Sequence, residues 1–259
     1  MLTVTHANGI ATVTLDRPDV RNAINAELIG ALRDCFVALA TDDAARVVVL
    51  TGAGEVFSAG ADIEWMHAAA RFTVDENARE ARQMADMFAT IDRCPKPVVA
   101  RVNGAAFGGG VGLVACCDIA VAVEGARFSF SEVRLGIAPA TISPFVLRKI
   151  GASQARALFL SAERFDAARA KEIGLVHAVV HAEELDAAVA RQTEMLLQGG
   201  PHALAAAKEL VQELPGMTDG EQRAYTATLI ASLRTSPEGQ EGLHAFLDRR
   251  PPAWTPETD

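Results

Sequence analysis

A short run of β-branched residues, Arg46–Thr51 (RVVVLT), constrains the fold more than any other segment. Residues of this type favour a strand, and the run shows no alternation of polar and apolar side chains. A strand without alternation is typical of a sheet that is covered on both faces, as in α/β proteins. Pro97–Val102 (PVVARV) is predicted to form another strand. An α/β core is therefore expected.

The segments around these strands predict how the core is connected. Asn8-Gly9 separates two alternating runs and is a strong signal for a β-hairpin. The order strand, strand, helix recurs with variations, which favours a core that winds in the turns of a coil. The other expected elements are the hairpin strands Leu2–His6 and Ile10–Leu15, the strands Asp118–Val123, Ala126–Phe130 and Leu175–Val180, a helix capped by Asn25 that runs to Leu39, and helices at Asp75–Asp92 and Pro139–Ile150.

The chain changes character after about Ala152. Strand signals almost vanish there, and helical periodicity runs to Leu247. The periodicity breaks at Gly199–Pro201, at Pro215-Gly216 and at Pro237, as expected where glycine and proline end helices. We therefore expect two parts, a core over residues 1–200 and a helical C-terminal module over residues 201–259.

Composition excludes several classes of protein. The chain has 259 residues, of which 50% are hydrophobic, so it is expected to fold rather than to be disordered. Its most apolar stretch, Gly104–Cys117, is too short to cross a bilayer. A net charge of -9 and the lack of any basic run longer than Arg249-Arg250 argue against a nucleic-acid partner. Four cysteines without a CxxC pair fit a reducing cytoplasm, where we expect the protein to act without contacting a membrane.

Two segments rich in small residues follow the buried strands. In Val56–Ile63 (VFSAGADI), Ser58–Ala61 would let a ligand approach backbone N–H groups, although a tight strand-to-helix connection needs small residues as well. In Asn103–Gly112 (NGAAFGGGVG), three consecutive glycines lead into a predicted helix. A dinucleotide fingerprint is the alternative for the second segment, but its glycines begin five residues after the strand ends. No Gly-Lys-Ser/Thr follows, which excludes a P-loop.

A third segment, Phe128–Pro144, carries Glu132 in apolar surroundings just after a predicted strand. Burial would raise the pKa of this carboxyl group and suit it to proton transfer near neutral pH. The alternative is a surface ion pair with Arg127 or Arg134. The six histidines are scattered along the chain, and no metal site is expected.

Together the three segments resemble the crotonase family, also called the enoyl-CoA hydratase/isomerase family. The resemblance covers essentially the whole chain and rests on RPDVRNA near the start, VVVLTGAG, FSAGADI, KPVVARVNGAAFGGG, CCDIAVA, SEVRLGIAP, LSAERFDAARAKEIGLVHAVV and AFLDRRPPAW. It implies a spiral of ββα units followed by a helical trimerisation module, assembled as a homotrimer or as a hexamer of two trimers.

The resemblance also implies the chemistry. Family members bind acyl-CoA thioesters, so coenzyme A is part of the substrate and no separate cofactor is expected. The backbone N–H groups of Ala61 and Gly109 would form an oxyanion hole for the thioester oxygen, and Glu132 would act on water and protons. Hydratases of the family commonly carry a second glutamate, whose position falls at Gly112 in this chain.

Binding residues for the coenzyme A part are implied in the same way. Val20 and Arg21 would lie near the pantetheine or the phosphates, with Ala23 as a further binding residue. The adenine side would be lined by Ala59, Ala61, Asp62 and Ile63. Phe246 and Arg249 would reach the nucleotide of a neighbouring subunit, although an ordinary solvated tail is an alternative for the arginine.

The finer resemblance is to bacterial methylglutaconyl-CoA and carboxygeranoyl-CoA hydratases, which act on branched, carboxylated enoyl-CoAs. Thr141, Ser143 and Arg134 are candidates to bind a distal carboxylate, although Ser143-Pro144 also fits a helix cap. Trp65, Met66 and the helix after Asp75 are expected to shape the acyl pocket. We therefore expect an enoyl-CoA hydratase. The alternatives are a Δ3-Δ2 enoyl-CoA isomerase that uses the single glutamate and an acyl-CoA-binding member with weak catalysis.

Overall fold

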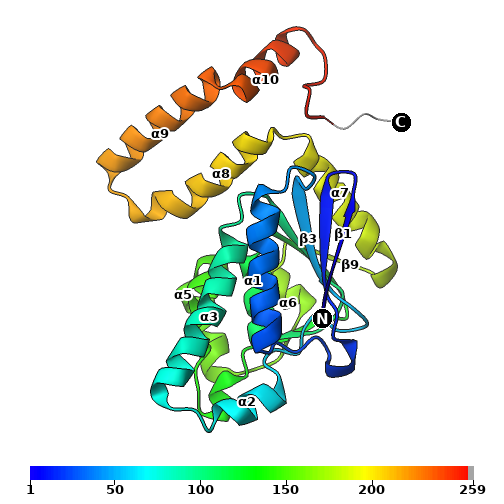
Figure 1. Ribbon diagram of the computed structural model, residues 1–259, viewed down its shortest axis with the longest axis vertical. Helices are drawn as coiled ribbons and strands as arrows, with labels where there is room; N and C mark the ends of the chain where they lie inside the picture. Colours follow the sequence, from blue (N-terminus) through cyan, green and yellow to red (C-terminus); the bar gives the residue numbers. More distant parts are fainter. Residues whose placement is uncertain (256–259) are drawn as a thin grey trace.

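The predicted buried strands lie next to each other in the middle of one sheet. Figure 1 shows the whole chain, with this sheet between helices. The computed structural model describes residues 1–255. Its large sheet has the order β1-β2-β3-β4-β6-β9, in which the β1–β2 pair is antiparallel and every other pair is parallel. These strands are β1 (Leu2–Ala7), β2 (Ile10–Leu15), β3 (Val47–Gly52), β4 (Val98–Val102), β6 (Ile119–Val123) and β9 (Ala178–Val180). Every residue of β3 is buried, which confirms the prediction from its sequence.

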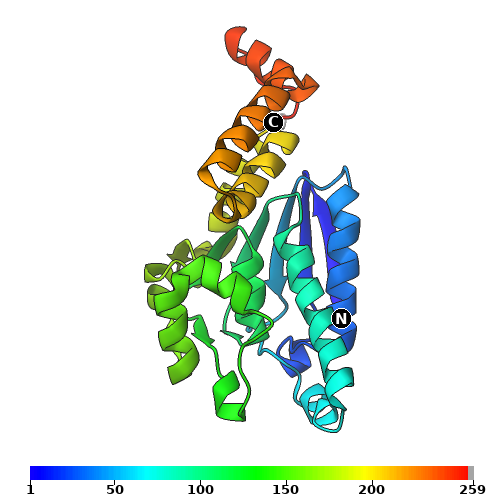
Figure 2. The same ribbon diagram turned by 90° about the vertical axis from the view of Figure 1, so that its left-hand side faces the viewer.

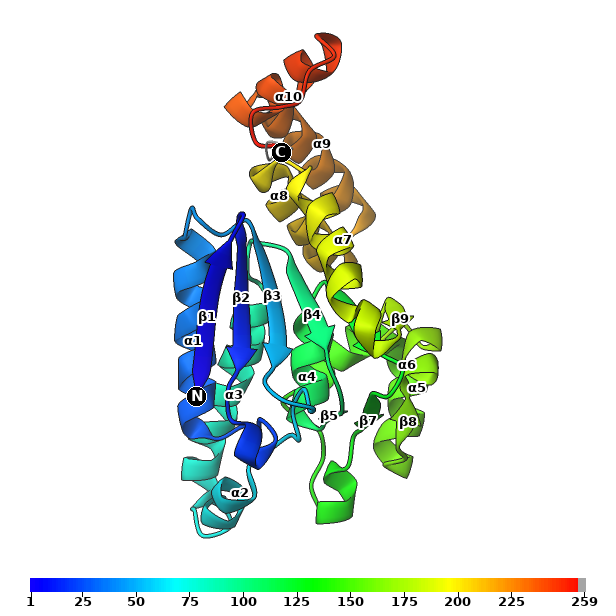
Figure 3. The same ribbon diagram turned by 90° about the vertical axis from the view of Figure 1, so that its right-hand side faces the viewer.

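A second ladder of short extended segments lies beyond the ends of the large sheet (Figure 3). It contains β5 (Ala106–Phe107), β7 (Arg127–Ser129) and β8 (Phe165–Asp166). Two single bridges continue it, Ser58 with Ala106 and Ile24 with Ala61. From β2 to β7, each turn of the chain adds one strand to the large sheet and then one short segment to the ladder, whereas in the last turn β8 of the ladder precedes β9 of the large sheet. This winding is the spiral core that the resemblance implies.

Helices cover both faces of the large sheet. The helices are α1 (Ala26–Thr41), α2 (Ile63–Ala69), α3 (Val74–Asp92), α4 (Gly109–Cys116), α5 (Ser143–Ser161), α6 (Ala167–Glu172), α7 (Leu185–Leu197), α8 (Pro201–Glu213), α9 (Asp219–Thr235) and α10 (Pro237–Leu247), with short 3-10 turns η1 (Pro18–Val20), η2 (Glu132–Leu135), η3 (Ala182–Glu184) and η4 (Leu214–Gly216). Figure 3 shows α7 in front of β4, whereas α1 and α3 lie behind the sheet. Helix α4 is buried along its whole length, so the triple glycine leads directly into the core.

Local signals placed most element ends correctly. Asn8 and Gly9 have φ of 50 and 77°, as a tight hairpin turn requires. The Asn25 side chain accepts a hydrogen bond from the Leu28 N–H (2.9 Å) and caps α1, which runs to Thr41. Helix α3 begins after Thr73, which forms a capping box with Glu76.

The helix predicted at Pro139–Ile150 is wrong at both ends. Helix α5 begins at Ser143, and the four residues before it form a loop. The helix continues past Ile150 to Ser161, with a kink where Gly151 takes φ 73°. Strand β8 was also not predicted, because a two-residue segment shows no alternation.

The C-terminal helices lead away from the sheet (Figure 2). The breaks that precede α8 and α10 and the turn η4 fall where glycine and proline predicted them. The guanidinium of Arg46, the residue before β3, donates to the carbonyls of Leu197 (3.0 Å), Gly199 (2.8 Å) and Trp254, and so holds the turn before α8 and the tail. A division of the chain at residue 200 stays a prediction. Among residues 1–255 we find no helix with the length and apolar character to span a bilayer.

Candidate active site

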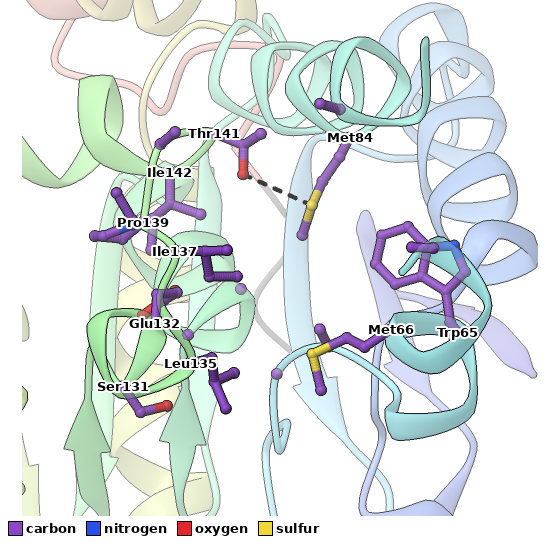
Figure 4. A pocket seen from close by; sticks show the side chains of 18 of the residues that line it. Trp65, Met66, Met84, Ser131, Glu132, Leu135, Ile137, Pro139, Thr141 and Ile142 are labelled. Carbon is purple, nitrogen blue, oxygen red and sulfur yellow. Dashed lines mark hydrogen bonds between the residues drawn. The ribbon is translucent and has the colours of Figure 1, made fainter. Parts of the chain in front are cut away.

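A cavity of about 380 Å³ lies between α2, α3 and the loop that follows β7 (Figure 4). It brings together Ala61, Gly109 and Glu132, which come from three separate turns of the spiral. Its walls are mostly apolar, and Figure 4 shows Trp65 and Met66 opposite Glu132 and Ile137. The prediction that Trp65, Met66 and the helix after Asp75 line the pocket is confirmed.

The Ala61 N–H is free to face the cavity because of the bridge to Ile24. In that bridge Ile24 donates to the Gly60 carbonyl (2.7 Å) and accepts from the Asp62 N–H (2.9 Å). Alternate N–H groups of an extended segment point in opposite directions, so the Ala61 N–H points away from Ile24. It donates to no oxygen within residues 1–255, and Ala61 lines the cavity.

The Gly109 N–H is free because it opens a helix. The first N–H groups of a helix have no partner within it, and the preceding Gly108 has no side chain to cap them. In the described part of the chain the Gly109 N–H also finds no acceptor. A Cβ atom at Gly60 would lie 2.7 Å from the Phe107 carbonyl oxygen, so the two backbone segments are in contact. Two unpaired donors therefore lie on adjoining segments at one wall.

Buried polar groups hold the Ala61 segment in place. Asn22 is fully buried and donates to the carbonyls of Ala53 (2.9 Å) and Val56 (2.8 Å). Arg17 pairs with Asp62 at 3.0 Å, and Asp62 accepts from the first N–H groups of α2. Burial opposes ionisation of Asp62, yet its pKa is lowered because the Trp65 N–H and the Arg17 guanidinium bind the carboxylate. The Asp62 carboxylate is thus already bound by groups of its own chain.

Glu132 contributes a half-buried carboxyl group to the cavity. It begins η2, and its Oε1 would lie 3.1 Å from a Cβ at Gly108, so the absence of that Cβ makes room for the carboxyl group. Its Oε2 is buried and has no partner among the described residues. Burial raises the pKa of Glu132 above the usual value of 4.5. The alternative of an ion pair with Arg127 or Arg134 is wrong, since Arg127 binds backbone carbonyls and Glu132 forms no salt bridge in residues 1–255.

The position of the missing second glutamate is filled by other side chains. Gly112 is buried in α4, and a Cβ there would lie 2.3 Å from Ile142 Cγ2 and 3.0 Å from Phe88 Cε1. No side chain fits without a shift of these neighbours. The loss of the carboxyl group is therefore accompanied by a packed contact in its place.

This packing predicts a stability effect for Gly112→Ala. Overpacking a well-packed core typically costs about 1–3 kcal/mol, and we expect a loss of that size in the free energy of unfolding. Ile142→Ala shortens the neighbouring side chain and makes room for the new methyl group. The double variant should therefore lose less unfolding free energy than the sum of the losses of the two single variants. Urea unfolding of the wild type, both single variants and the double variant measures the coupling. Gly30→Ala, with nothing within 4 Å of the new methyl group, is the matched control and should not destabilise. Full stability of Gly112→Ala would contradict this account.

The residues expected to bind coenzyme A fall into two groups. Val20, Arg21, Ala23 and Ala59 lie around one turn, in which the Ala59 N–H donates to the Arg21 carbonyl (2.9 Å). Ile63, with 78% of its surface exposed, begins α2 beside this turn. The second group consists of Phe246 in α10 and Arg249 just after it, and α10 lies at the opposite end of the molecule from α2 (Figure 1). One chain does not bring them to the cavity, and their role in a neighbouring subunit stays a prediction.

Of the three candidates for a distal carboxylate, one lines the cavity. Thr141 does, and its hydroxyl donates to Met84 Sδ at 3.6 Å, as drawn in Figure 4. Ser143 is the first residue of α5, and its hydroxyl donates to the Ala140 carbonyl (2.8 Å). Neither Ser143 nor Arg134 belongs to the lining.

Sequence reasoning assigned the helix after Asp75 to the pocket without singling out Glu80 and Met84, and it missed Ile142 as a lining residue. Glu80 and Met84 are four residues apart on α3, and this spacing could have shown that both lie on the same face of the helix. Ile142 gave no such signal, because it follows a loop. No group of three or more His, Cys, Asp or Glu within residues 1–255 is arranged to hold a metal ion.

The spiral fold, together with a cavity that has two unpaired backbone N–H groups beside a half-buried carboxyl group, points to one class of enzymes. The chain belongs to the enoyl-CoA hydratase/isomerase family, whose model matches residues 5–257. It is 34% identical to the crotonyl-CoA hydratase of Syntrophomonas wolfei over 93% of this chain and 92% of that protein. It is 33% identical to the 2,3-dehydroadipyl-CoA hydratase of Escherichia coli over 97% of each chain.

Solved structures agree with this assignment. An enoyl-CoA hydratase from Shewanella pealeana superposes with a TM-score of 0.95 at 39% identity, over 98% of this chain and 95% of that one. The protein is thus an enzyme of the hydratase/isomerase type that acts on acyl-CoA substrates.

Proposed function

We propose that the protein hydrates α,β-unsaturated acyl-CoA thioesters with Glu132 as its single catalytic carboxyl group. One observation carries the proposal: the unpartnered Glu132 carboxyl and the unpaired N–H groups of Ala61 and Gly109 line the same cavity. The relatives named as hydratases support it. Coenzyme A enters as part of the substrate, and the proposed reaction uses no separate cofactor.

The reaction can proceed with one carboxyl group. Glu132, ionised, takes a proton from water while the water oxygen bonds to the β-carbon. The electron pair of the C=C bond moves toward the thioester, whose oxygen becomes an enolate bound by the two N–H groups. Protonated Glu132 then donates its proton to the α-carbon, which restores the thioester and completes the addition of water. The raised pKa of Glu132 suits a group that both accepts and donates a proton.

The second candidate function is isomerisation of a 3-enoyl-CoA. This reaction needs only one carboxyl group, and the space that a second one would occupy at Gly112 is filled. Glu132 would take a proton from the α-carbon of a 3-enoyl-CoA and return it to the γ-carbon, through the same bound enolate. A third candidate is an acyl-CoA-binding protein with weak turnover.

Absorbance of the conjugated thioester separates these candidates. The hydratase consumes crotonyl-CoA and loses the absorbance, whereas the isomerase gains it from a 3-enoyl-CoA. We expect hydration to have the higher kcat/KM. Hydration undetectable beside clear isomerisation would overturn the proposal in favour of the isomerase, and binding without turnover of either substrate would favour the third candidate.

Two further features complete the proposal. We infer a homotrimer or hexamer, supported by apolar side chains that α8, α9 and α10 leave exposed, among them Val211 (77%), Ile230 (47%) and Phe246 (81%). A cytoplasmic location is supported by four free cysteines, three of them buried.

A further inference from the structure

We propose that the cavity selects acyl chains without a carboxylate, and that Glu80 on α3 is the residue that rejects carboxylated ones. The inference rests on the proposed function, because it concerns the acyl chain of the same thioester. It differs from the sequence resemblance, which favours branched, carboxylated substrates.

The cavity walls supply apolar contacts and no positive charge. Apolar side chains come from both sides, with Trp65, Met66 and Met84 on one and Leu135 and Ile137 on the other. Within the described residues, none of those that line the cavity is Lys, Arg or His. A bound carboxylate normally needs a cationic or amide donor to replace the water that it loses. The lining offers no cation for that purpose.

Two neutral donors of the lining are already engaged, whereas the buried indole N–H of Trp65 has no partner in the described residues. The Asn77 amide donates to the carbonyls of Ala69, Phe72 and Thr73, each at 3.2 Å, and so closes the turn between α2 and α3. The Thr141 hydroxyl donates to Met84 Sδ. A carboxylate that used either group would first have to break these contacts.

Glu80 adds a negative charge to this wall. It lines the cavity one helical turn before Met84, and in residues 1–255 it forms no ion pair. A carboxylate on the acyl chain would lose water and also meet this like charge in apolar surroundings. An uncharged chain avoids both costs and gains contact with the methionine and tryptophan side chains. The charges of the coenzyme A part are the same for a carboxylated and an uncharged acyl chain, so they do not contribute to this preference.

A matched pair of substrates tests the proposal. 2-Hexenoyl-CoA and 2,3-dehydroadipyl-CoA have acyl chains of the same length and differ in a terminal methyl or carboxylate group. We expect kcat/KM to favour hexenoyl-CoA by at least about 100-fold. Hexanoyl-CoA and adipyl-CoA, which lack the double bond, should show the same preference as competitive inhibitors. Equal values for the members of a pair would overturn the proposal.

Charge substitutions on α3 assign the preference to Glu80. Glu80→Gln should narrow the hexenoyl to dehydroadipyl ratio by about tenfold, and Glu80→Lys should narrow it further. Asp86→Asn removes the same charge from the same helix outside the cavity and should leave the ratio unchanged. An unchanged ratio in both Glu80 variants would overturn its role. Inhibition by the saturated esters reports the preference even without turnover, so a failure of the proposed hydration is distinguishable from a failure of this inference.

Discussion

Glu132→Gln is expected to lower kcat for hydration by about 10²–10⁴-fold, the usual contribution of a general acid–base group. The amide is nearly isosteric with the carboxyl group, so substrate binding and KM should change little. Among the described residues, Glu132 is the carboxyl group that lies beside Gly108, whereas Glu80, the other carboxyl of the lining, comes from α3. Steady-state rates with crotonyl-CoA measure the effect, and Glu163→Gln, an exposed residue outside the cavity, is the control. Wild-type kcat in the Gln variant would exclude the proposed mechanism.

The pH dependence gives the same substitution a second readout. The free enzyme needs Glu132 ionised, so kcat/KM falls as pH drops through the pKa of Glu132. Because burial raises that pKa, the midpoint should lie above 4.5, the ordinary value for a glutamate.

A raised pKa of Glu132 also means that the folded state binds the proton more tightly than the unfolded state. This group therefore lowers stability as pH rises through the interval between the two pKa values. Glu132→Gln should therefore raise Tm at neutral pH, and the gain should vanish below about pH 4.

Ala61→Pro is expected to lower kcat by about 10²–10³-fold, as loss of one oxyanion donor does elsewhere. Proline has no N–H, and the Ala61 N–H takes no part in the bridge to Ile24, so the substitution removes the proposed donor without removing a hydrogen bond of the fold. Ala61→Gly keeps the N–H and is the matched control. Near-wild-type kcat in the proline variant would argue against this donor.

Folding of the proline variant is checked independently of its activity. Its Tm should stay close to that of the wild type if only the oxyanion donor is lost. Ala59→Pro gives the contrasting result, because the Ala59 N–H donates to the Arg21 carbonyl at 2.9 Å. That variant should lose stability together with activity.

The sequence predicted the parts of the fold that local chemistry determines. The β-branched residues of β3, the Asn-Gly turn and the Asn25 cap each act through neighbours in the chain, and all three are confirmed. The start of α5 was wrong because the loop before it carries apolar residues that face the cavity, which look like the buried side of a helix. Periodicity cannot separate these two causes of an apolar residue.

The candidate site was predictable to a different extent. The apolar surroundings of Glu132 indicated a raised pKa from the residues alone, and the structure confirms its direction. Ala61 and Gly109 came from the family resemblance, since a backbone donor leaves almost no trace in side-chain chemistry. The contact of Ile142 with Gly112 could not be predicted, because it joins residues that only the folded chain brings together.

That contact also constrains which sequences can be reached from this one by single steps. Gly112→Glu would place a charged side chain in a space held by Ile142 and Phe88, so it would damage the fold before it could supply a second carboxyl group. Room would have to be made first at Ile142, at a cost of about 2–5 kcal/mol for a large-to-small core substitution, against a total stability of about 5–15 kcal/mol for a typical protein. Either order of changes passes through a weakened protein. The single-carboxyl site is therefore a local optimum, and an engineered two-glutamate variant should be built with both positions changed together.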